Sequence, residues 1–448
     1  MMTFELPKNS KMLQPEFTFG VATAAFQIEG ATTEDGRCES IWDRFCSLPG
    51  KVLNGDDGTE ACDHYHRLEQ DLDLIKELGF DAYRFSVAWP RIEPAEGEWN
   101  ELGFAFYQRL IDGLIERGIK PYLTLYHWDL PQYLEDKGGW INRETAYRFV
   151  DYAEKITQRF GDKVACYTTF NEPWCAAFLG YRRGEHAPGL AEDRLGFQAA
   201  HHMMLAHGLA LPKMRKAAPK AKHGIVLNFM LAYANSDSAA DVAAAHYCNE
   251  ENNYFFLDAL LNAQYPESIW QKHPDWRPMM LPGDLAIINT EMDYIGINYY
   301  SSTLIKAGSD GADYDFGESE LPKTDIGWAI YPKALTETLV NYKKRYPNFP
   351  AVLITENGAA DNTPIVDGKI TDDMRSQYYA DHLLALNDAI EAGVDVQGYF
   401  AWSLMDNFEW AFGYSQRFGI VHVDYQTQQR TIKKSGLEWQ RFLKARSR

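Results

Sequence analysis

The sequence predicts one α/β domain, a (β/α)8 barrel that covers residues 1–448 and carries long loops at the carboxyl ends of its strands. Short apolar segments alternate along the chain with longer segments of helical periodicity, and eight of each kind can be found. No low-complexity linker and no internal repeat marks a domain boundary. The length of 448 residues suits a single large barrel with long loops.

The predicted strands are short runs of apolar and β-branched residues that end at polar or turn-forming residues. A parallel strand buried on both faces is apolar almost throughout, which is the pattern of these segments. In chain order, the strands are expected over residues 17–25, 82–87, 120–126, 165–170, 224–230, 294–298, 351–355 and 396–403.

A predicted helix follows each predicted strand. The segment 66–78 has apolar residues at every third or fourth position, which is the period of one helix face. Glycine closes several of the helices, and Pro332 begins another, as is typical of helix ends. The connections after the first, sixth and eighth strands are too long for simple turns, and loops of that length are usually functional. The helices are expected over residues 66–78, 102–116, 144–160, 194–216, 239–261, 332–345, 374–392 and 434–445.

Composition and charge exclude several kinds of partner. The 63 acidic residues outnumber the 44 basic ones, and the net charge of −19 argues against nucleic acids and anionic membranes. No apolar run reaches the roughly 18 residues of a membrane span, and the N-terminus lacks an apolar signal core. The six cysteines form no C-x-x-C pair, so we expect free thiols and a cytoplasmic location. A homo-oligomer is left open.

Two of the predicted strands end in a glutamate. Glu172 follows the strand over residues 165–170, and Glu356 follows the strand over residues 351–355. A barrel brings the carboxyl ends of all its strands to one mouth, where ligands bind. These two strands lie on roughly opposite sides of the barrel, so their carboxylates can face each other across the mouth.

The other strand ends supply amides, a histidine, a guanidinium and indoles, rather than a set of metal ligands or a glycine-rich phosphate loop. Hydrogen-bonding groups combined with aromatic faces suit a neutral, polyhydroxylated ligand, and aromatic residues make up 14% of the chain. The residues expected around the mouth are Gln27, Glu29, Arg84, His127, Trp128, Asn171, Asn298, Tyr299, Tyr300, Trp402, Asp406, Glu409 and Trp410.

A pair of carboxylates can hydrolyse a sugar acetal. One protonates the leaving oxygen, and the other attacks the anomeric carbon when the two lie about 5–5.5 Å apart, which is the retaining arrangement. Glu172 precedes Pro173 and Trp174, an apolar setting that would raise its pKa and keep it protonated. Arg84 near Glu356 would favour the ionised, nucleophilic form.

Several segments resemble the signatures of glycoside hydrolase family 1, the β-glucosidase family. Two of them surround the glutamates, Thr169-Phe170-Asn171-Glu172-Pro173 and Ile354-Thr355-Glu356-Asn357-Gly358. The resemblance extends over roughly residues 17–439, with its motifs in the family's order. The further matching segments are residues 17–30, 83–92, 126–129, 296–300 and 402–410.

The resemblance implies a retaining β-glucosidase that acts on terminal β-D-glucosyl residues, with some β-galactoside or β-fucoside activity and no cofactor or metal. Glu172 would be the acid/base and Glu356 the nucleophile. The sugar hydroxyls would bind Gln27, His127, Asn171, Glu409 and Trp410, with Trp128 beside them. Trp402 would stack under the sugar, Asn298 and Tyr300 would position Glu356 with support from Arg84, and Trp328 would line the aglycone side. The family often has Glu where this chain has Ala329, which leaves the aglycone preference open.

Three alternatives stay open. A 6-phospho-β-glycosidase of the same family would have a small residue in place of Glu409 and a phosphate-binding lysine nearby. The segment 412–417 lacks that lysine, although Arg417 could bind an anion. A barrel that binds sugar without hydrolysing it would lack one carboxylate, and a metal-dependent amide hydrolase would use the pair His64 and His66, which lies outside the strand ends.

Overall fold

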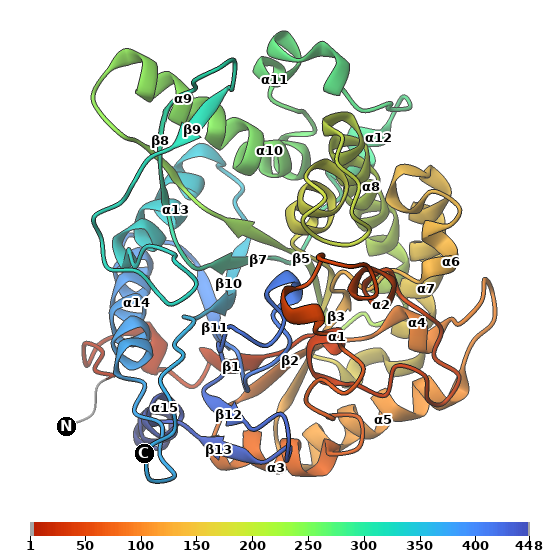
Figure 1. The fold of residues 1–448 in the computed structure, drawn as a ribbon, viewed down its shortest axis with the longest axis vertical. Helices are drawn as coiled ribbons and strands as arrows, with labels where there is room; N and C mark the ends of the chain where they lie inside the picture. The colour runs from red at the N-terminus through yellow and green to blue at the C-terminus, as the bar shows by residue number, and fades with distance from the viewer. Residues whose placement is uncertain (1–3, 447–448) are drawn as a thin grey trace.

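The computed structural model describes residues 4–446 and forms a closed barrel of parallel strands at the centre of the molecule (Figure 1). Neighbours around the barrel are β1-β11-β10-β7-β5-β4-β3-β2, so the barrel strands follow one another in chain order. This confirms the predicted fold class. The barrel strands are β1 (Thr18–Ala22), β2 (Ala82–Ser86), β3 (Lys120–Tyr126), β4 (Cys166–Asn171), β5 (Lys222–Phe229), β7 (Tyr294–Tyr299), β10 (Ala351–Asn357) and β11 (Val396–Trp402).

Helices surround the barrel, and each predicted helix is present within a few residues of its expected bounds (Figure 1). In α3 the buried residues fall at the predicted spacing, and the helix ends at Gly79, whose φ of 84° is left-handed. The main helices are α3 (Leu68–Leu78), α5 (Glu101–Glu116), α7 (Arg143–Phe160), α8 (Asp193–Ala217), α9 (Ala239–Asn249), α10 (Phe255–Asn262), α13 (Pro332–Arg345), α14 (Asp373–Glu391) and α15 (Lys434–Arg446). Shorter helices are α1 (Ala25–Ile28), α2 (Ile41–Cys46), α4 (Trp89–Ile92), α6 (Gln132–Glu135), α11 (Glu267–Lys272) and α12 (Asp284–Ile288).

Two predicted elements differ from the structure. The first strand was expected to reach residue 25, but the backbone N–H of Ala25 donates to Ser86 Oγ (2.7 Å) and α1 begins there. The helix expected over residues 239–261 is divided by a π-helical turn, Glu250–Tyr254. Within that turn Asn252 Nδ2 donates to the carbonyl of Cys248 (2.9 Å), so a side chain competes for a backbone acceptor of the helix.

The long connections contain sheets that the sequence analysis did not predict. A three-stranded sheet, β6-β8-β9, packs with α9 beside the barrel, and β12 pairs with β13 after the last barrel strand. Four of these strands have only three residues, which is too short a pattern to recognise, and β6 pairs with β8, which is distant in sequence. The additional strands are β6 (Ala232–Ala234), β8 (Thr303–Ala307), β9 (Tyr314–Phe316), β12 (Val421–Val423) and β13 (Arg430–Ile432).

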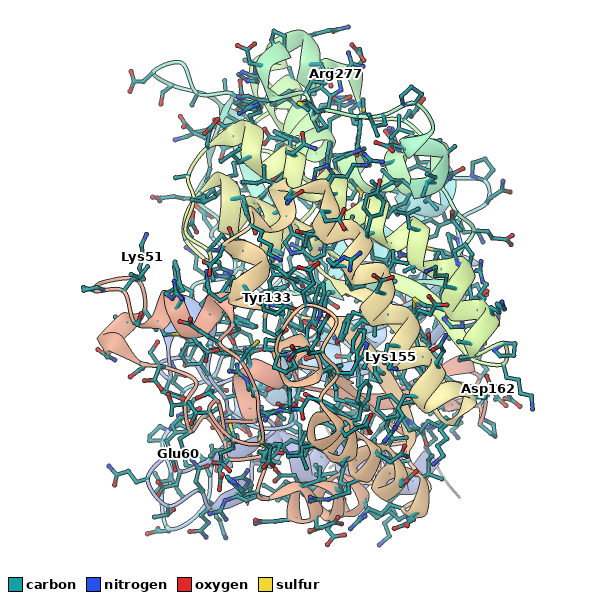
Figure 2. All side chains as sticks on the ribbon, turned by 90° about the vertical axis from the view of Figure 1, so that its right-hand side faces the viewer. Lys51, Glu60, Tyr133, Lys155, Asp162 and Arg277 are labelled. Atoms are coloured by element: carbon teal, nitrogen blue, oxygen red, sulfur yellow. The ribbon has the colours of Figure 1, made fainter. Side chains whose placement is uncertain are left out.

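Charged side chains on the outer loops face solvent. Lys51, Glu60, Asp162 and Arg277 lie at the periphery of the molecule and are exposed (Figure 2). None of the helices within residues 4–446 combines the length and the apolarity that crossing a bilayer requires.

A buried ion-pair cluster joins the loop after β11 to the start of α15. The carboxylate of Asp406 accepts from Lys433 Nζ (2.7 Å) and Arg417 Nη1 (2.6 Å). The side chains of Asp406 and Lys433 are 0% and 1% exposed. Since an isolated buried charge is costly, each partner depends on the other.

We predict that Lys433→Met lowers the free energy of unfolding by about 3–5 kcal/mol, because it leaves the Asp406 carboxylate short of one buried cation. The neighbouring Lys434 pairs with Asp373 at the surface, so Lys434→Met provides a matched control that should cost about 0–1 kcal/mol. Urea unfolding of both variants measures the difference. Equal losses would show that the buried pair contributes no more than the surface pair.

Candidate active site

One pocket opens at the carboxyl ends of the barrel strands and has a volume of about 380 Å³, within the range of small-ligand sites. It contains most of the residues predicted around the mouth. Gln27, Arg84 and Asn171 are fully or almost fully buried and support the pocket through hydrogen bonds to other residues. The predicted residues that line the pocket are His127, Trp128, Glu172, Asn298, Tyr300, Trp328, Glu356, Trp402, Glu409 and Trp410.

Glu356 is held by a cation and a phenol. Its Oε1 accepts from Arg84 Nη1 (2.7 Å), and its Oε2 accepts from the Tyr300 hydroxyl (2.6 Å). The glutamate is 3% exposed and Arg84 is 1% exposed, so water screens this ion pair little. The arrangement favours an ionised carboxylate at the end of β10.

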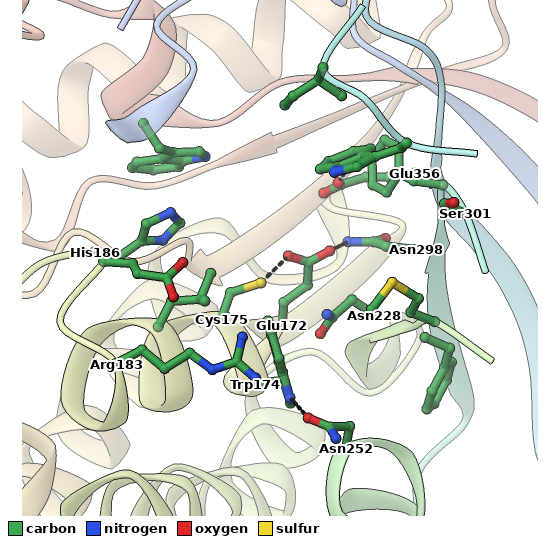
Figure 3. Close-up of a pocket in the computed structure, with 18 of the residues that line it drawn as sticks. Glu172, Trp174, Cys175, Arg183, His186, Asn228, Asn252, Asn298, Ser301 and Glu356 are labelled. Atoms are coloured by element: carbon green, nitrogen blue, oxygen red, sulfur yellow. Dashed lines mark hydrogen bonds between the residues drawn. The ribbon is translucent and has the colours of Figure 1, made fainter. Parts of the chain in front are cut away.

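Glu172 has neutral partners instead. Its Oε1 accepts from Asn298 Nδ2 (2.7 Å), and its Oε2 accepts from Cys175 Sγ (3.1 Å), as the dashed lines in Figure 3 show. The side chain is buried, and no ion pair to it is present among the described residues. The two glutamates of one pocket therefore differ in their electrostatic surroundings.

An amide network joins the two carboxylates and fixes the orientation of a histidine. Asn171 Oδ1 accepts from Arg84 Nη2 (2.7 Å) and from Asn298 Nδ2 (3.0 Å). The Nδ2 group of Asn171 must then donate to His127 Nε2 (3.1 Å). It follows that His127 is protonated on Nδ1, which is buried and has no hydrogen-bond partner among the described residues.

Comparison with known proteins identifies the family. The model of glycosyl hydrolase family 1 matches residues 9–447. The chain belongs to glycosyl hydrolase family 1.

Its relatives include a β-glucosidase from an Agrobacterium species, which is 48% identical over 94% of this chain and 93% of its own length. A bifunctional β-D-glucosidase/β-D-fucosidase from Bifidobacterium breve is 46% identical over 98% of each chain. The solved structure of a family 1 β-glucosidase from Thermotoga maritima superposes with a TM-score of 0.95 at 43% identity, over 98% of this chain and 99% of that one. These similarities cover the barrel and the long loops together.

The surroundings of the two carboxyls in this family 1 glycosidase shift their pKa values unequally. Burial raises the pKa of Glu172, and the nearby Glu356 raises it further, while Asn298 and Cys175 act in the opposite direction. Burial also raises the pKa of Glu356, but Arg84 and then Tyr300 oppose that effect. Because Glu356 has the adjacent guanidinium, Glu172 is the carboxyl that retains its proton to higher pH.

Two further groups in the glycosidase present polar atoms without partners among the described residues. Gln27 donates to Asn407 Oδ1 (3.1 Å) and to the carbonyl of Phe408 (2.8 Å), so its buried Oε1 remains as a free acceptor. Glu409 Oε2 is also buried and without a partner in the described chain. Burial, with the charges of Glu356 and Glu172, raises the pKa of Glu409 to about 8. This shift favours the protonated form of Glu409 in the free pocket.

Three indoles of the pocket, those of Trp128, Trp402 and Trp410, lie around His127. The rings of Trp402 and Trp410 are nearly parallel to the imidazole, with centroids 5.9 Å from it in both cases. Glu172, Trp128 and Trp410 have left-handed backbone angles, with φ of 48°, 83° and 50°. Non-glycine residues adopt this region rarely, and functional sites hold a large share of such cases.

Further residues line the pocket besides those at the strand ends. Trp174 and Leu179, which follow Glu172, form part of the wall, and Cys175 contacts the glutamate directly. Cys175 is only three positions after Glu172, and Asn228 falls within the predicted fifth strand, so proximity to a strand end could have identified both. Five of the others come from β9 and from the helical segment before it: Cys248, Asn252, Asn253, Tyr314 and Phe316.

The residues on which two of the alternative functions depend do not line the pocket. His64 is buried against Asp71 (Nδ1 to Oδ2, 2.8 Å) and is not among the pocket-lining residues, and residues 4–446 contain no group of three or more side chains placed to hold a metal ion. Arg417 donates to Asp406 Oδ2 (2.6 Å) and to the carbonyl of Val423 (3.0 Å), so its guanidinium is engaged away from the pocket.

We predict that His127 stays neutral and Nδ1-protonated from pH 8 down to pH 5. Burial and then the Arg84 charge lower its pKa well below the usual value, because both disfavour the imidazolium. Nitrogen NMR of histidine-labelled protein, with His127→Gln for assignment, measures this. His66 is the internal control: hydrogen bonds to Asp63 and Glu34 raise its pKa, so it should show an imidazolium signal at the acidic end of that interval. An imidazolium signal from His127 at pH 6 would contradict the prediction.

Proposed function

We propose that this family 1 enzyme is a retaining β-glucosidase that hydrolyses terminal, non-reducing β-D-glucosyl residues of cellobiose, short β-glucans and aryl or alkyl β-glucosides. Glu356 is the nucleophile and Glu172 the acid/base. One observation carries the assignment: Glu172 and Glu356 are buried in the same pocket at the ends of β4 and β10, and of these two only Glu356 is paired with a cation, Arg84. The names of the relatives support the same activity.

In the first step, Glu356 attacks the anomeric carbon while Glu172 gives its proton to the glycosidic oxygen, which leaves as an alcohol. In the second step, Glu172, now ionised, takes a proton from water as the water oxygen attacks the glycosyl-enzyme and Glu356 departs. The sugar leaves with its original β configuration. Tyr300 and Arg84 fit the role of holding Glu356, because both donate hydrogen bonds to its oxygens.

The remaining pocket residues fit the recognition of a sugar. The Nδ1–H of His127 is a donor, while Gln27 Oε1 is an acceptor, and both lack partners in the described part of the chain. Asn171 would share in binding a hydroxyl near the nucleophile, and Trp128 and Trp410 would supply further contacts. Trp402 would lie beneath the ring and Trp328, which is 37% exposed, would face the leaving group. The bifunctional relative supports an accompanying β-fucosidase activity.

We predict different rescue products for the two carboxyl variants. Glu356→Gly should abolish hydrolysis, and azide should then yield the α-glucosyl azide, because the small anion occupies the face that the nucleophile left. Glu172→Ala should slow deglycosylation, and azide should yield the β-glucosyl azide from the intact glycosyl-enzyme. Product NMR measures the configuration at the anomeric carbon. If each variant gave the azide of the opposite configuration, the two roles would be reversed. Full activity in both variants would show that neither carboxyl is catalytic, and a parent protein that binds glucosides without hydrolysing them would leave the sugar-binding barrel.

The competing substrate is a β-glucoside with a phosphate at O6. Such a group brings about −1.5 to −2 charges into a pocket where Glu356 is paired with Arg84 as an ionised carboxylate and where burial, Glu356 and Glu172 already disfavour a negative charge on Glu409. Arg417, the cation considered for this phosphate, is paired with Asp406. These charges favour the unmodified sugar.

We predict that the parent enzyme prefers 4-nitrophenyl β-glucoside over its 6-phosphate, and that Glu409→Ser reduces kcat/KM much more for the neutral substrate. The reason is that Glu409 offers hydrogen bonds to sugar hydroxyls and, once ionised, repels a phosphate. Steady-state kinetics with both substrates measures this. Equal or faster turnover of the 6-phosphate by the parent enzyme would establish the alternative function.

A further inference from the structure

A buried thiol contacts the carboxyl of Glu172. Cys175 begins a π-helical segment, Cys175–Arg182, that follows the end of β4, and π-helical segments are frequent at functional sites. Its Sγ lies 3.1 Å from Glu172 Oε2 and forms part of the pocket wall (Figure 3). The residue is 8% exposed. It is therefore a direct partner of the group that must both give and take a proton in the reaction.

The two oxygens of Glu172 are not equivalent. Asn298 directs an N–H at Oε1 (2.7 Å) and cannot turn its amide around, because its Oδ1 accepts from Thr355 Oγ1 (2.7 Å). The same Nδ2 group also donates to Asn171 (3.0 Å). Oε1 therefore faces a fixed donor in every protonation state, so Oε2 is the oxygen that carries the acidic proton.

We propose that Cys175 is a positioning residue for the proton of Glu172. Its S–H stabilises Oε2 while the carboxylate is ionised, and as a weak donor it releases that oxygen at low cost when Oε2 takes up the proton. The inference rests on the proposed acid/base role of Glu172. A thiol suits this position because Oε2 must alternate between accepting a hydrogen bond and holding a proton.

The thiol keeps its hydrogen throughout the working pH range. Burial raises the pKa of Cys175 well above its usual value, and the charge of Glu172 raises it further. The ordering of the two groups is then fixed: Cys175 always donates, and only Glu172 changes its protonation state. The other titratable or charged groups that face this pair are Glu356, Arg84, Glu409, Tyr300 and Arg183.

The test is the alkaline limb of kcat/KM for an aryl β-glucoside with a poor leaving group, which reports loss of the proton from Glu172 in the free enzyme. An S–H bond to the ionised form lowers the pKa of Glu172, so its removal raises that pKa. Cys175→Ala should move the alkaline limb upward by about half a pH unit. Cys175→Ser keeps a donor, so its limb should stay at or below that of the parent.

Cys248→Ala is the matched control. This thiol also lines the pocket and is buried, but it interacts with Asn252 rather than with Glu172 (Nδ2 to Sγ, 3.6 Å). Its removal should leave the alkaline limb unchanged. Thermal melting of all three variants separates a loss of folded protein from a change in the limb.

The outcomes distinguish this inference from the proposed function. If the parent shows a bell-shaped pH profile and Cys175→Ala has the same alkaline limb as the parent, the role of Cys175 is refuted, while the acid/base role of Glu172 stands. Equal shifts in Cys175→Ala and Cys175→Ser would also refute it. Serine keeps a hydrogen-bond donor at this position and alanine does not, so a shift common to both cannot come from the loss of the donor. An alkaline limb that persists in Glu172→Gln would refute the acid/base assignment and this inference together.

Discussion

The guanidinium of Arg84 is the group on which the arrangement of this site depends. It projects from β2 and reaches two other strands, with one nitrogen on Glu356 (2.7 Å) and another on Asn171 (2.7 Å). A buried cation requires compensation, and here the nucleophile candidate and an amide oxygen provide it. The contact to Asn171 orients that amide, which in turn sets the tautomer of His127. One charge therefore determines the ionisation of Glu356 and the donor offered by His127.

The difference between Glu172 and Glu356 comes from their partners rather than from their depth. Both glutamates are almost completely buried, and burial alone would raise both pKa values. Glu356 has Arg84 and Tyr300, whereas Glu172 has an amide and a thiol. Two identical side chains can thus take the acid and the nucleophile roles in one pocket.

The barrel strands and the segments that connect them each form part of the pocket wall. Strand ends supply the carboxyls and the polar groups that suit a sugar, while β9 and the segment around Asn252 supply much of the wall on the other side. Trp174 Nε1 donates to Asn252 Oδ1 (2.9 Å), so the loop after Glu172 is tied to that segment. This connection is therefore coupled to the loop that carries Cys175, the thiol partner of Glu172.

The sequence by itself determined the eight-fold alternation, the two strand-end glutamates and the strand-end side chains that line the pocket beside them. These features are local, since hydrophobic period and strand-end position can be read within a dozen residues, and the barrel then brings the ends together. It could not determine which oxygen of Glu172 faces Asn298, which nitrogen of His127 carries the hydrogen, or the contact of Cys175. Nor could it predict β6, β8 and β9, or the raised pKa of Glu409. The orientations of Asn298 and His127 and the pKa of Glu409 depend on groups remote in the chain: Arg84 and Glu356, for example, are 272 positions apart. Only the closed barrel brings such groups within hydrogen-bond distance and removes the water that would otherwise compete for them.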